Sequence, residues 1–441
     1  MPRRRAFVLF EFMNAMLVTA QAAKARGFAV VALNRNPLCA EGPFAVPDGL
    51  VDEYVQVASW TDPTVVEPLL KYLTGRYEIA GTHSVFEGAL VHQAALRELA
   101  GLPTTDPATL RGILDKAQVR ARLQEAGLTA LRTAPLEEAL AWETWGFDRP
   151  AVLKPANGTG SALCFEVASP GELRAAVETV ERTDVVNPLM RDYIRAHGSF
   201  VLEERAEGEL LSVESMVHRG EVGFLGLTGR YVLASDPVVE QGTQIPYFHP
   251  HMESIVELSR AVHEALGFHH GGSHLEFMVA EDGTAELIDF NARSAGFASP
   301  VTTGAAYGID FGEVLVDVGC GIRPDLSFTR RAHRFAVEMV VLPRPGTTEF
   351  RSIEFPDDAL APRASKSVGE KLSGRADQLD AVGMFIVTGD TASEAHRRGL
   401  RARREVVVNG EPLGDHPNNV VAHSRHIGRD LPAPSPTGGP R

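Results

Sequence analysis

The feature of this chain that most constrains its fold is the regular alternation of short apolar runs with helical stretches between residues 6 and 99. Strands are predicted at residues 6–10, 28–33, 53–57 and 79–81, and helices at residues 14–26, after Pro63 and at residues 85–99. This order predicts an open, mostly parallel sheet with helices packed against it. The first strand-to-helix turn lacks the G-x-G-x-x-G pattern that binds a dinucleotide pyrophosphate, so an ordinary NAD-binding domain is disfavoured.

The pattern changes after a turn-rich break at residues 103–107. Asp106 and Pro107 are typical of a helix start, and one helix is expected from there to about Glu125. Strands joined by short turns follow, at residues 151–154, 200–204, 211–217, 221–227, 274–279 and 286–290. The Asp282-Gly283 pair predicts a hairpin between the last two. The middle of the chain is therefore expected to be α+β with antiparallel sheets.

A smaller C-terminal unit is predicted after residue 328. Its strands are expected at residues 334–342, 382–388 and 405–408, with a helix at about residues 391–403. The last residues are rich in Pro, Gly and Ser and are expected to be disordered.

Composition excludes several classes of function. No apolar run reaches the ~18 residues that a membrane span needs. The three cysteines are far apart and odd in number, so they indicate a reducing cytoplasm rather than a disulfide framework. The net charge of −14 argues against a nucleic-acid partner, because such proteins usually carry a basic surface.

A lysine and a glycine-containing loop suggest a phosphate site. Lys154 ends a predicted strand, and residues 156–161 follow with the sequence Ala-Asn-Gly-Thr-Gly-Ser. Backbone N–H groups of such a loop can close on phosphate oxygens while the ammonium contacts a phosphate as a point charge. Taken alone the signal is weak, because lysines before glycine turns are common.

A second group of polar residues suggests a metal site. If the strand persists, its pleat sends Asp289, Asn291 and Arg293 to one side, and the predicted hairpin brings Glu276 close to Asp289. Two carboxylates and an amide oxygen are hard ligands suited to Mg²⁺. The alternative is a solvated outward face, although carboxylates inside an apolar strand are costly unless paired or metal-bound.

An acidic strand end offers a third signal. Residues 203–206 read Glu-Glu-Arg-Ala and precede a turn at Gly208 and then Glu209. The backbone of such an edge can meet an adenine ring, and Glu209 can accept hydrogen bonds from ribose hydroxyls. The alternative is a solvated acidic turn.

Together and in this order, these features resemble the ATP-grasp superfamily over about residues 105–325. The resemblance implies an ATP-grasp fold of the α/β and α+β class, and adds Lys116 as an early lysine that contacts the nucleotide. The implied ATP-binding residues are Lys116, Lys154, Asn157, Gly158, Thr159, Gly160, Ser161, Glu203, Glu204, Arg205, Ala206 and Glu209. The implied metal ligands are Glu276, Asp289 and Asn291, and Arg293 is the implied catalytic residue.

The resemblance also implies how the chain is divided. A Rossmann-like domain (pre-ATP-grasp) is expected at residues 1–104, and the ATP-grasp domain at residues 105–328 with a lid at about residues 130–206. A C-terminal subdomain is expected at residues 329–426, and a disordered tail at residues 427–441.

Within the superfamily, the chain is most similar to carboxylate–amine ligases of the L-amino-acid ligase (bacilysin synthetase) type. The similarity rests on residues 236–242, 291–296, 304–310 and 382–389. Ala292 departs from it, because the usual motif is Asn-Pro-Arg. The resemblance implies that ATP and Mg²⁺ (or Mn²⁺) drive amide or peptide bond formation through an acyl-phosphate. Amino-acid substrates and a homodimer are implied, with no nucleic acid or membrane partner. The alternatives are a biotin-carboxylase-like or purine-pathway ATP-grasp enzyme, and a non-catalytic nucleotide-binding regulator.

Three other patterns are better explained without chemistry. The histidines at 263, 269, 270 and 274 lack a consistent zinc-ligand spacing. Cys164 lies in an apolar strand without a paired base in sequence, and is expected to be buried and structural. The arginines of residues 397–404 are expected to form a solvated helix face.

Overall fold

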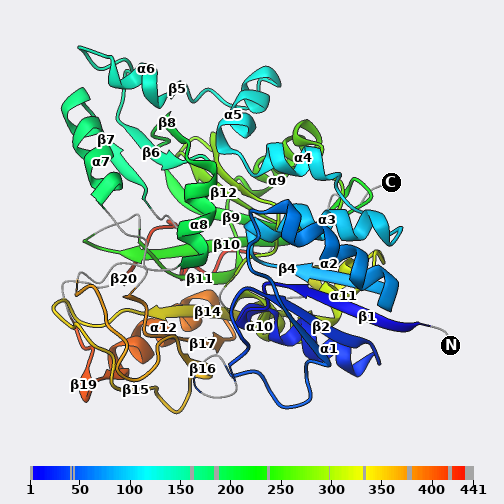
Figure 1. Cartoon of the computed structure of the whole chain (residues 1–441). Coiled ribbons are helices and arrows are strands. Elements are labelled where there is room, and N and C mark those ends of the chain that lie inside the picture. Colours follow the sequence, from blue (N-terminus) through cyan, green and yellow to red (C-terminus); the bar gives the residue numbers. More distant parts are fainter. Residues whose placement is uncertain are drawn as a thin grey trace.

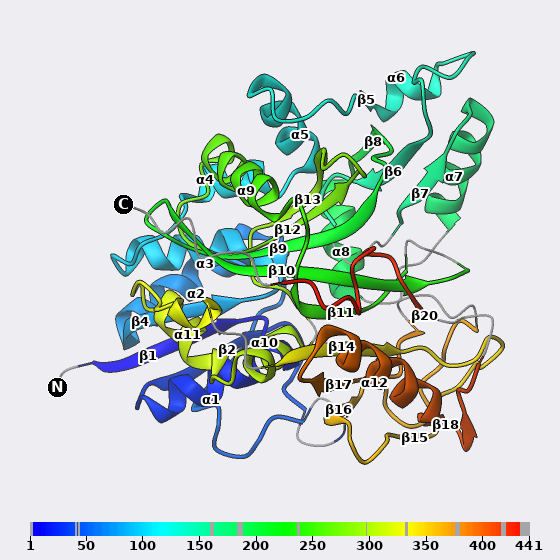
Figure 2. The same ribbon diagram turned by 180° about the vertical axis from the view of Figure 1, so that it is seen from behind.

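A computed structural model describes most of the chain, and its strands form four sheets. Figures 1 and 2 show these sheets from opposite sides. The described residues are 3–39, 42, 45–158, 163–182, 188–235, 239–296, 298–330, 334–374, 380–415 and 420–432.

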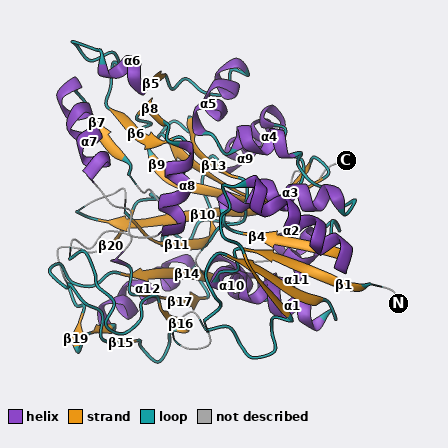
Figure 3. Cartoon of the chain, viewed as in Figure 1, coloured by secondary structure: helices purple, strands orange, loops and turns teal. Residues whose placement is uncertain are grey.

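The N-terminal sheet is parallel throughout, with strand order β3-β2-β1-β4. Its strands are β1 (Arg4–Phe10), β2 (Ala29–Asn34), β3 (Glu53–Gln56) and β4 (Tyr77–Ser84). Helices α2 (Pro63–Arg76) and α3 (Glu87–Leu99) pack on one face, and α1 (Leu17–Ala25) and α11 (Phe311–Gly319) pack on the other. Both faces are therefore covered (Figure 3), which explains why β1 is a continuous apolar run rather than an alternating one. The predicted parallel sheet is confirmed.

The central sheet is antiparallel, with strand order β13-β12-β9-β10-β11-β14-β17-β16, and β20 pairs with the end of β10. Its strands are β9 (Glu209–His218), β10 (Glu221–Leu233), β11 (Glu240–Tyr247), β12 (Gly271–Val279), β13 (Ala285–Asn291), β14 (Phe335–Val341), β16 (Leu360–Ala364), β17 (Gly383–Gly389) and β20 (Val420–Ala422). Helix α9 (Met252–Leu266) packs on the face that carries Leu211, Val213 and Leu275, and this contact forms the main hydrophobic core. We call the face under α9 the back face of the central sheet.

A separate lid sheet has strand order β5-β8-β6-β7. Its elements are β5 (Thr133–Pro135), α6 (Leu136–Leu140), β6 (Ala151–Pro155), β7 (Phe165–Val167), α7 (Pro170–Arg182), α8 (Pro188–His197) and β8 (Phe200–Glu204). This sheet has its own small core, which includes Leu153, Leu173 and Leu202. Figure 1 shows it standing above the central sheet, away from the N-terminal sheet.

Two predictions about the elements are wrong. The single helix expected from Asp106 to Glu125 is two helices, α4 (Pro107–Ile113) and α5 (Lys116–Glu125). The break arises because the Asp115 side chain accepts hydrogen bonds from the N–H groups of Ala117 and Gln118 and so caps a new helix.

The strands expected in a separate C-terminal unit instead continue the central sheet through β14 and β17. The expected helix is α12 (Ala392–Glu405), which packs on these two strands. A three-stranded sheet of β15 (Ile353–Glu354), β18 (Val407–Val408) and β19 (Glu411–Pro412) stands apart. The remaining elements are α10 (Ser299–Tyr307) and the short 3-10 helices η1 (Asn14–Met16) and η2 (Ser327–Arg330).

The predicted disordered tail is wrong for residues 427–432. Ile427 is buried in the main core, the Gly428 N–H donates to Gln244 Oε1, and Asp430 accepts hydrogen bonds from Ser393. Residues 433–441 lie outside the described residues. Across the described ranges, no helix combines the length and the apolar character needed to cross a bilayer.

Candidate nucleotide and metal site

Lys154 connects the lid sheet to the central sheet. It lies on β6, it is buried, and its Nζ donates to Glu203 Oε1 on β8 at 2.9 Å. The same Nζ donates to the carbonyl oxygen of Ile288 on β13, also at 2.9 Å. The strand-end lysine predicted from the sequence therefore lies at the junction of the two sheets.

Glu203 holds two cations at this junction. Its Oε2 accepts from Arg120 Nε at 2.8 Å, and Arg120 also donates to the carbonyl of Leu287 at 2.6 Å. Burial alone would raise the pKa of Glu203, but the charges of Lys154 and Arg120 outweigh it and the pKa is lowered. Glu203 is thus an anion enclosed between two cations.

Lys116 starts α5 directly after the Asp115 cap. Its Nζ donates to the carbonyl of Gly158 at 2.9 Å and lies 3.1 Å from Asp289 Oδ1. Burial would lower the pKa of Lys116, but the charges of Asp289 and Glu87 outweigh it and raise the pKa. Helix α5 therefore connects the start of the glycine loop to β13.

The predicted metal ligands lie on two neighbouring strands. Glu276 on β12 is the direct antiparallel partner of Asp289 on β13, and Asn291 lies two residues further along β13. The predicted hairpin is present, because the Gly283 N–H donates to the carbonyl of Ala280, and a one-residue register shift between Phe277 and Glu276 makes Asp289 the partner of Glu276. Directly opposed residues have Cβ atoms about 4.5–5.5 Å apart, so one cation can reach both carboxylates.

The environment of Glu276 favours its ionised form. Glu276 Oε1 lies 3.1 Å from His274 Nε2 and 3.8 Å from an Arg230 nitrogen. Burial opposes the carboxylate, but His274 and Arg230 outweigh it and lower the pKa of Glu276 to about 2. Two partly buried carboxylates and an amide oxygen are the kind of oxygen ligand set that Mg²⁺ prefers, so the residues present fit this cation.

Arg293 lies where the central sheet meets the N-terminal sheet. Its guanidinium contacts Glu87, at the start of α3, at 2.9 Å and donates to Asn291 Oδ1 at 3.0 Å. The predicted catalytic arginine is therefore next to a predicted metal ligand. A cavity between the sheets is lined by several of these side chains, including Glu87, Lys116, Lys154, Glu203 and Asp289.

The stretch that carries most of these residues matches a known family. Residues 147–301 match the family model described as an ATP-grasp domain. The chain contains an ATP-grasp domain. The match includes Lys154, Glu203 and the predicted metal ligands, whereas Lys116 precedes it.

A curated relative shares part of this length. The chain is 24% identical over 275 residues to the alanine–anticapsin ligase of Bacillus subtilis. That alignment covers 58% of this chain and 57% of the relative, so the chain spans little more than half the length of the relative.

Solved structures share the fold over nearly the whole chain. An L-amino acid ligase from Bacillus licheniformis has a TM-score of 0.73 at 19% identity, covering 92% of this chain and 99% of that chain. The biotin carboxylase domain of a 2-oxoglutarate carboxylase from Hydrogenobacter thermophilus, in complex with MgADP and bicarbonate, has a TM-score of 0.68 at 17% identity. It covers 91% of this chain and 90% of that chain. At these identities the likeness establishes the fold alone, and the predicted ATP-grasp fold is confirmed.

Several predicted nucleotide residues of the ATP-grasp domain point elsewhere. Glu204 alternates with Glu203 on β8, and its carboxylate accepts from Arg132 on the other side of the lid. Arg205 pairs with Glu166 at 3.2 Å and is half-exposed. Ala206 is buried. These residues can offer backbone groups to a nucleotide, but of the four only Glu203 turns its side chain toward the lysines.

Glu209 does not join the ATP-grasp site, contrary to the prediction. Its carboxylate accepts hydrogen bonds from Tyr247 Oη at 2.7 Å and interacts with His249 at 3.1 Å. The alternation along β9 puts Glu209 on the back face with Leu211 and Val213. The preceding Gly208, with φ of +129°, lies so close to the Val279 carbonyl that a side chain would clash, and this tight turn sets the phase of the strand.

The glycine loop is described in part. Asn157 is buried and its Nδ2 donates to the carbonyl of Leu114, while Gly158 accepts from Lys116. Thr159, Gly160 and Ser161 lie outside the described residues.

Four residues beside the site were not predicted as part of it. Arg120 has a sequence signal, because it lies four residues after Lys116 on the same face of α5. His274 also has one, because it lies two residues before Glu276 on the same strand face. Burial would lower the pKa of His274, but Glu214 and Glu276 outweigh this effect and raise the pKa to about 9. Glu87 and Arg230 reach the site through tertiary contacts that no local pattern indicates.

Of the three patterns explained without chemistry, the histidines behave as expected. Cys164, predicted to be buried in a strand, lies just before β7 and is only partly buried, and Arg403, predicted to be solvated, is buried. His263 bonds to Ser273, whereas His270 bonds to the Val318 carbonyl, so the predicted histidines are not a cluster. Burial raises the pKa of Cys164 to about 11, which disfavours a nucleophilic thiolate. On α12, Arg398 and Arg401 both pair with Asp358.

Proposed function

We propose that this protein is an ATP-dependent carboxylate–amine ligase that forms an amide or peptide bond between amino-acid substrates. The observation that carries the proposal is the convergence of Lys116, Lys154, Glu276, Asp289 and Arg293 around one junction of sheets. The names of the curated relative and of the solved L-amino acid ligase support the same reaction class.

The chain's own residues can hold the triphosphate. Lys116 and Lys154 reach the junction from two sides, and their ammonium groups are now paired with Asp289 and Glu203. A triphosphate is a strong partner for these ammoniums, because it presents several anionic oxygens at once. We expect the glycine loop, of which residues 157 and 158 are described, to contact the phosphates, and the backbone of residues 204–206 to contact the adenine edge.

The pair of Lys116 with Asp289 links nucleotide binding to metal binding. When a phosphate takes the Lys116 ammonium, the Asp289 carboxylate loses its partner and is free to bind a cation together with Glu276 and Asn291. Mg²⁺ held there neutralises charge on the β- and γ-phosphates, and Mn²⁺ can substitute because it accepts the same oxygen ligands.

The proposed reaction consists of two successive displacements. A carboxylate oxygen of the first substrate attacks the γ-phosphorus, the bond to the β,γ-bridging oxygen breaks, and ADP leaves. The amine of the second substrate then attacks the acyl carbon, the carbon–oxygen bond to phosphate breaks, and the ammonium proton is lost to solvent. Arg293 holds the transferring phosphoryl group or the substrate carboxylate, and the closed loop excludes the water that would hydrolyse the acyl-phosphate.

Two other functions give different products. A biotin-carboxylase-like or purine-pathway enzyme would share this fold, and the similarity to the biotin carboxylase domain is consistent with it. A non-catalytic regulator would bind ATP without turnover, but the complete set of acidic and cationic residues favours an enzyme. We also propose a homodimer, which analytical ultracentrifugation can test.

The test is an ATPase screen over pairs of amino acids and other carboxylates, with mass detection of the products. The proposal predicts Mg²⁺-dependent release of ADP and phosphate that requires both a carboxylate and an amine, with a condensed product. Release of AMP and pyrophosphate would contradict it. Turnover that depends on bicarbonate would favour the carboxylase alternative, and binding without turnover would favour the regulator.

A further inference from the structure

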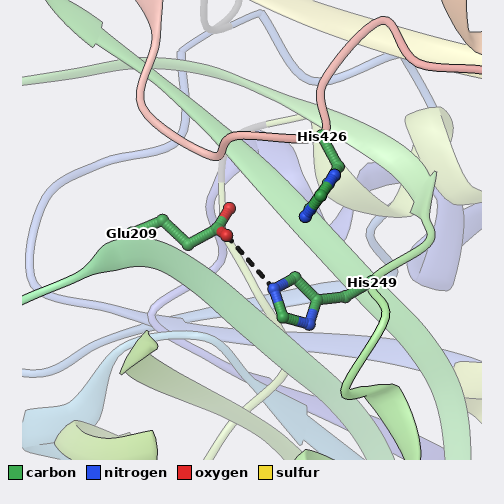
Figure 4. A group of neighbouring side chains, drawn as sticks. All are labelled: Glu209, His249 and His426. Carbon is green, nitrogen blue, oxygen red and sulfur yellow. Dashed lines mark hydrogen bonds and ion pairs between the residues drawn. The ribbon is translucent and has the colours of Figure 1, made fainter. Parts of the chain in front are cut away.

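The back face of the central sheet carries a group of metal-ligating side chains that the ATP-grasp reaction does not use. Glu209 begins β9, His249 lies between β11 and α9, and His426 lies in the C-terminal segment after β20. Figure 4 shows the three side chains turned toward one another. One ligand atom from each lies within 4.8 Å of the other two.

This group is separate from the proposed ATP-grasp site. Glu209 points with Leu211 and Val213 into the core under α9, whereas Ser212 and Glu214 point to the opposite face. That opposite face carries Arg230 and His274, which contact Ser212 and Glu214.

The Glu209 carboxylate is oriented for a ligand. Its Oε2 accepts from Tyr247 Oη at 2.7 Å and from the Arg425 N–H at 2.5 Å. Its Oε1 is left facing His249 Nε2 at 3.1 Å. Hydrogen bonds to the outer oxygen of a carboxylate are typical of metal ligands, because they fix its direction.

The two histidines offer nitrogens toward this oxygen. Nδ1 of His426 is buried and has no hydrogen-bond partner. Nδ1 of His249 accepts from the His251 N–H at 3.0 Å, so its proton is on Nε2 and points to Glu209. One ring nitrogen of His426 faces the space between Glu209 and His249 (Figure 4), so each of the three side chains directs a ligand atom to a shared point.

We propose that Glu209, His249 and His426 bind one Zn²⁺ ion, with water in the fourth position. Two imidazoles and a carboxylate are common zinc ligands, and ligand atoms of a tetrahedral zinc are about 3.3 Å apart, close to the spacing of Glu209 and His249. On binding, the His249 proton moves from Nε2 to Nδ1 and the hydrogen bond from the His251 N–H is lost. That loss is smaller than the free energy that zinc coordination supplies.

The ion fastens the C-terminal segment to the sheet. Residues 420–432 already contact the central sheet at Leu210 of β9. Ser424 donates to the Leu210 carbonyl, and His423 accepts from the Leu210 N–H. His426 adds the only proposed ligand from this segment. Zinc therefore joins three parts of the chain that are far apart in sequence, and its loss loosens the last of them.

The test is a calorimetric titration of the full-length protein, stripped of metal, with Zn²⁺ in excess Mg²⁺ to saturate the oxygen-ligand site. One equivalent of Zn²⁺ is expected to bind, and His426→Ala is expected to lower the affinity by about a hundredfold or more, since even loss of an outer partner costs 10–100-fold. The matched control is His251→Ala, which removes a neighbouring imidazole but no ligand, and it should bind Zn²⁺ as the wild type does. An Asp289→Asn variant should also bind normally, which separates this site from the proposed Mg²⁺ site.

Co²⁺ gives a second readout. In place of Zn²⁺ it should give visible ligand-field absorption in the wild type and in His251→Ala, and lose it in Glu209→Gln and His426→Ala. Circular dichroism checks that the variants are folded, and zinc should slow proteolysis of the C-terminal segment. Absence of stoichiometric binding by the wild type, or equal binding by His426→Ala, would overturn the proposal and leave a hydrogen-bonded cluster only. Neither result bears on ATP turnover.

Discussion

Replacing Glu203 with glutamine tests the electrostatic design of the junction between the lid and the central sheet. Glu203 lies 2.8 Å from Arg120 and 2.9 Å from Lys154, and all three side chains are buried. Glu203→Gln keeps the shape of the side chain but removes the negative charge that, within the described part of the chain, pairs with both cations. In the variant, the buried Arg120 and Lys154 repel each other, and only a neutral amide lies between them.

The magnitude follows from these distances. At an effective dielectric constant of about 20, each ion pair attracts by roughly 6 kcal/mol before desolvation is counted. The cost of desolvating the charges offsets much of this attraction. Arg120 and Lys154 stay buried in the variant, so their desolvation cost is not recovered when the Glu203 charge is removed. Removing one partner of a buried ion network costs about 3–5 kcal/mol, so Glu203→Gln should lower the unfolding free energy by that amount.

The assay is equilibrium urea unfolding followed by fluorescence and circular dichroism, with coincidence of the two curves as the check on two-state behaviour. The matched control is Glu204→Gln on the same strand, whose partner Arg132 is half-exposed. Glu204 is itself buried, but Arg132 stays solvated when the charge is removed, so the loss should be smaller, about 1.5–3 kcal/mol. Equal losses in the two variants, or a loss under about 0.5 kcal/mol for Glu203→Gln, would refute the reasoning.

Three further predictions concern the same junction. Asp289→Asn should lower kcat about a hundredfold while ATP still binds, because one charged contact to the reacting phosphates is lost; a wild-type rate across a Mg²⁺ titration would remove Asp289 from the site. Lys154→Met should weaken ATP binding, measured by calorimetry, because the methionine keeps the buried stem but lacks the ammonium; unchanged affinity would contradict the assignment. The lowered pKa of Glu203 means that its contribution to stability is fully present above the unfolded pKa of about 4.3 and is lost as pH falls through the lower folded pKa. Unfolding free energies measured from about pH 6 to pH 3 should therefore fall more steeply for the wild type than for Glu203→Gln, and parallel curves would argue against it.

The proximity of the proposed metal ligands could be predicted because it depends mainly on local rules. Strand alternation puts Asp289 and Asn291 on one side, and the tight turn of residues 280–283 brings Glu276 close to Asp289. Their direct opposition also needs a one-residue register shift beside Glu276, which the sequence does not reveal. Each step uses residues fewer than twenty positions apart. Arg120 could have been predicted in the same way, because helix geometry alone puts it beside Lys116.

Contacts between distant segments were not predictable. Glu87 meets Arg293 only because α3 and the end of β13 pack at the boundary of two sheets. Glu209 was predicted to contact the ribose, but its side chain lies on the back face with Leu211 and Val213, and the sequence does not reveal which residues of β9 face the nucleotide. His249 and His426 lie far apart in the chain, and strand β20 brings them together by pairing with β10.

The C-terminal strands illustrate the same limit. The apolar runs that became β14 and β17 were identified, but their partners were not. An antiparallel strand can extend a neighbouring sheet or start a new one with the same sequence pattern, and the choice depends on which edge is open. Here β11 offers that edge, and β14 pairs with it.

The central claim is that an acyl-phosphate forms between ATP and a carboxylate substrate. The most direct test supplies a substrate whose carboxylate is labelled with ¹⁸O and examines the released phosphate by mass spectrometry. The account predicts one labelled oxygen in each phosphate, formed together with one ADP and one amide, because the carboxylate oxygen that attacks the γ-phosphorus leaves with it. Unlabelled phosphate, or label recovered in AMP, would contradict the account.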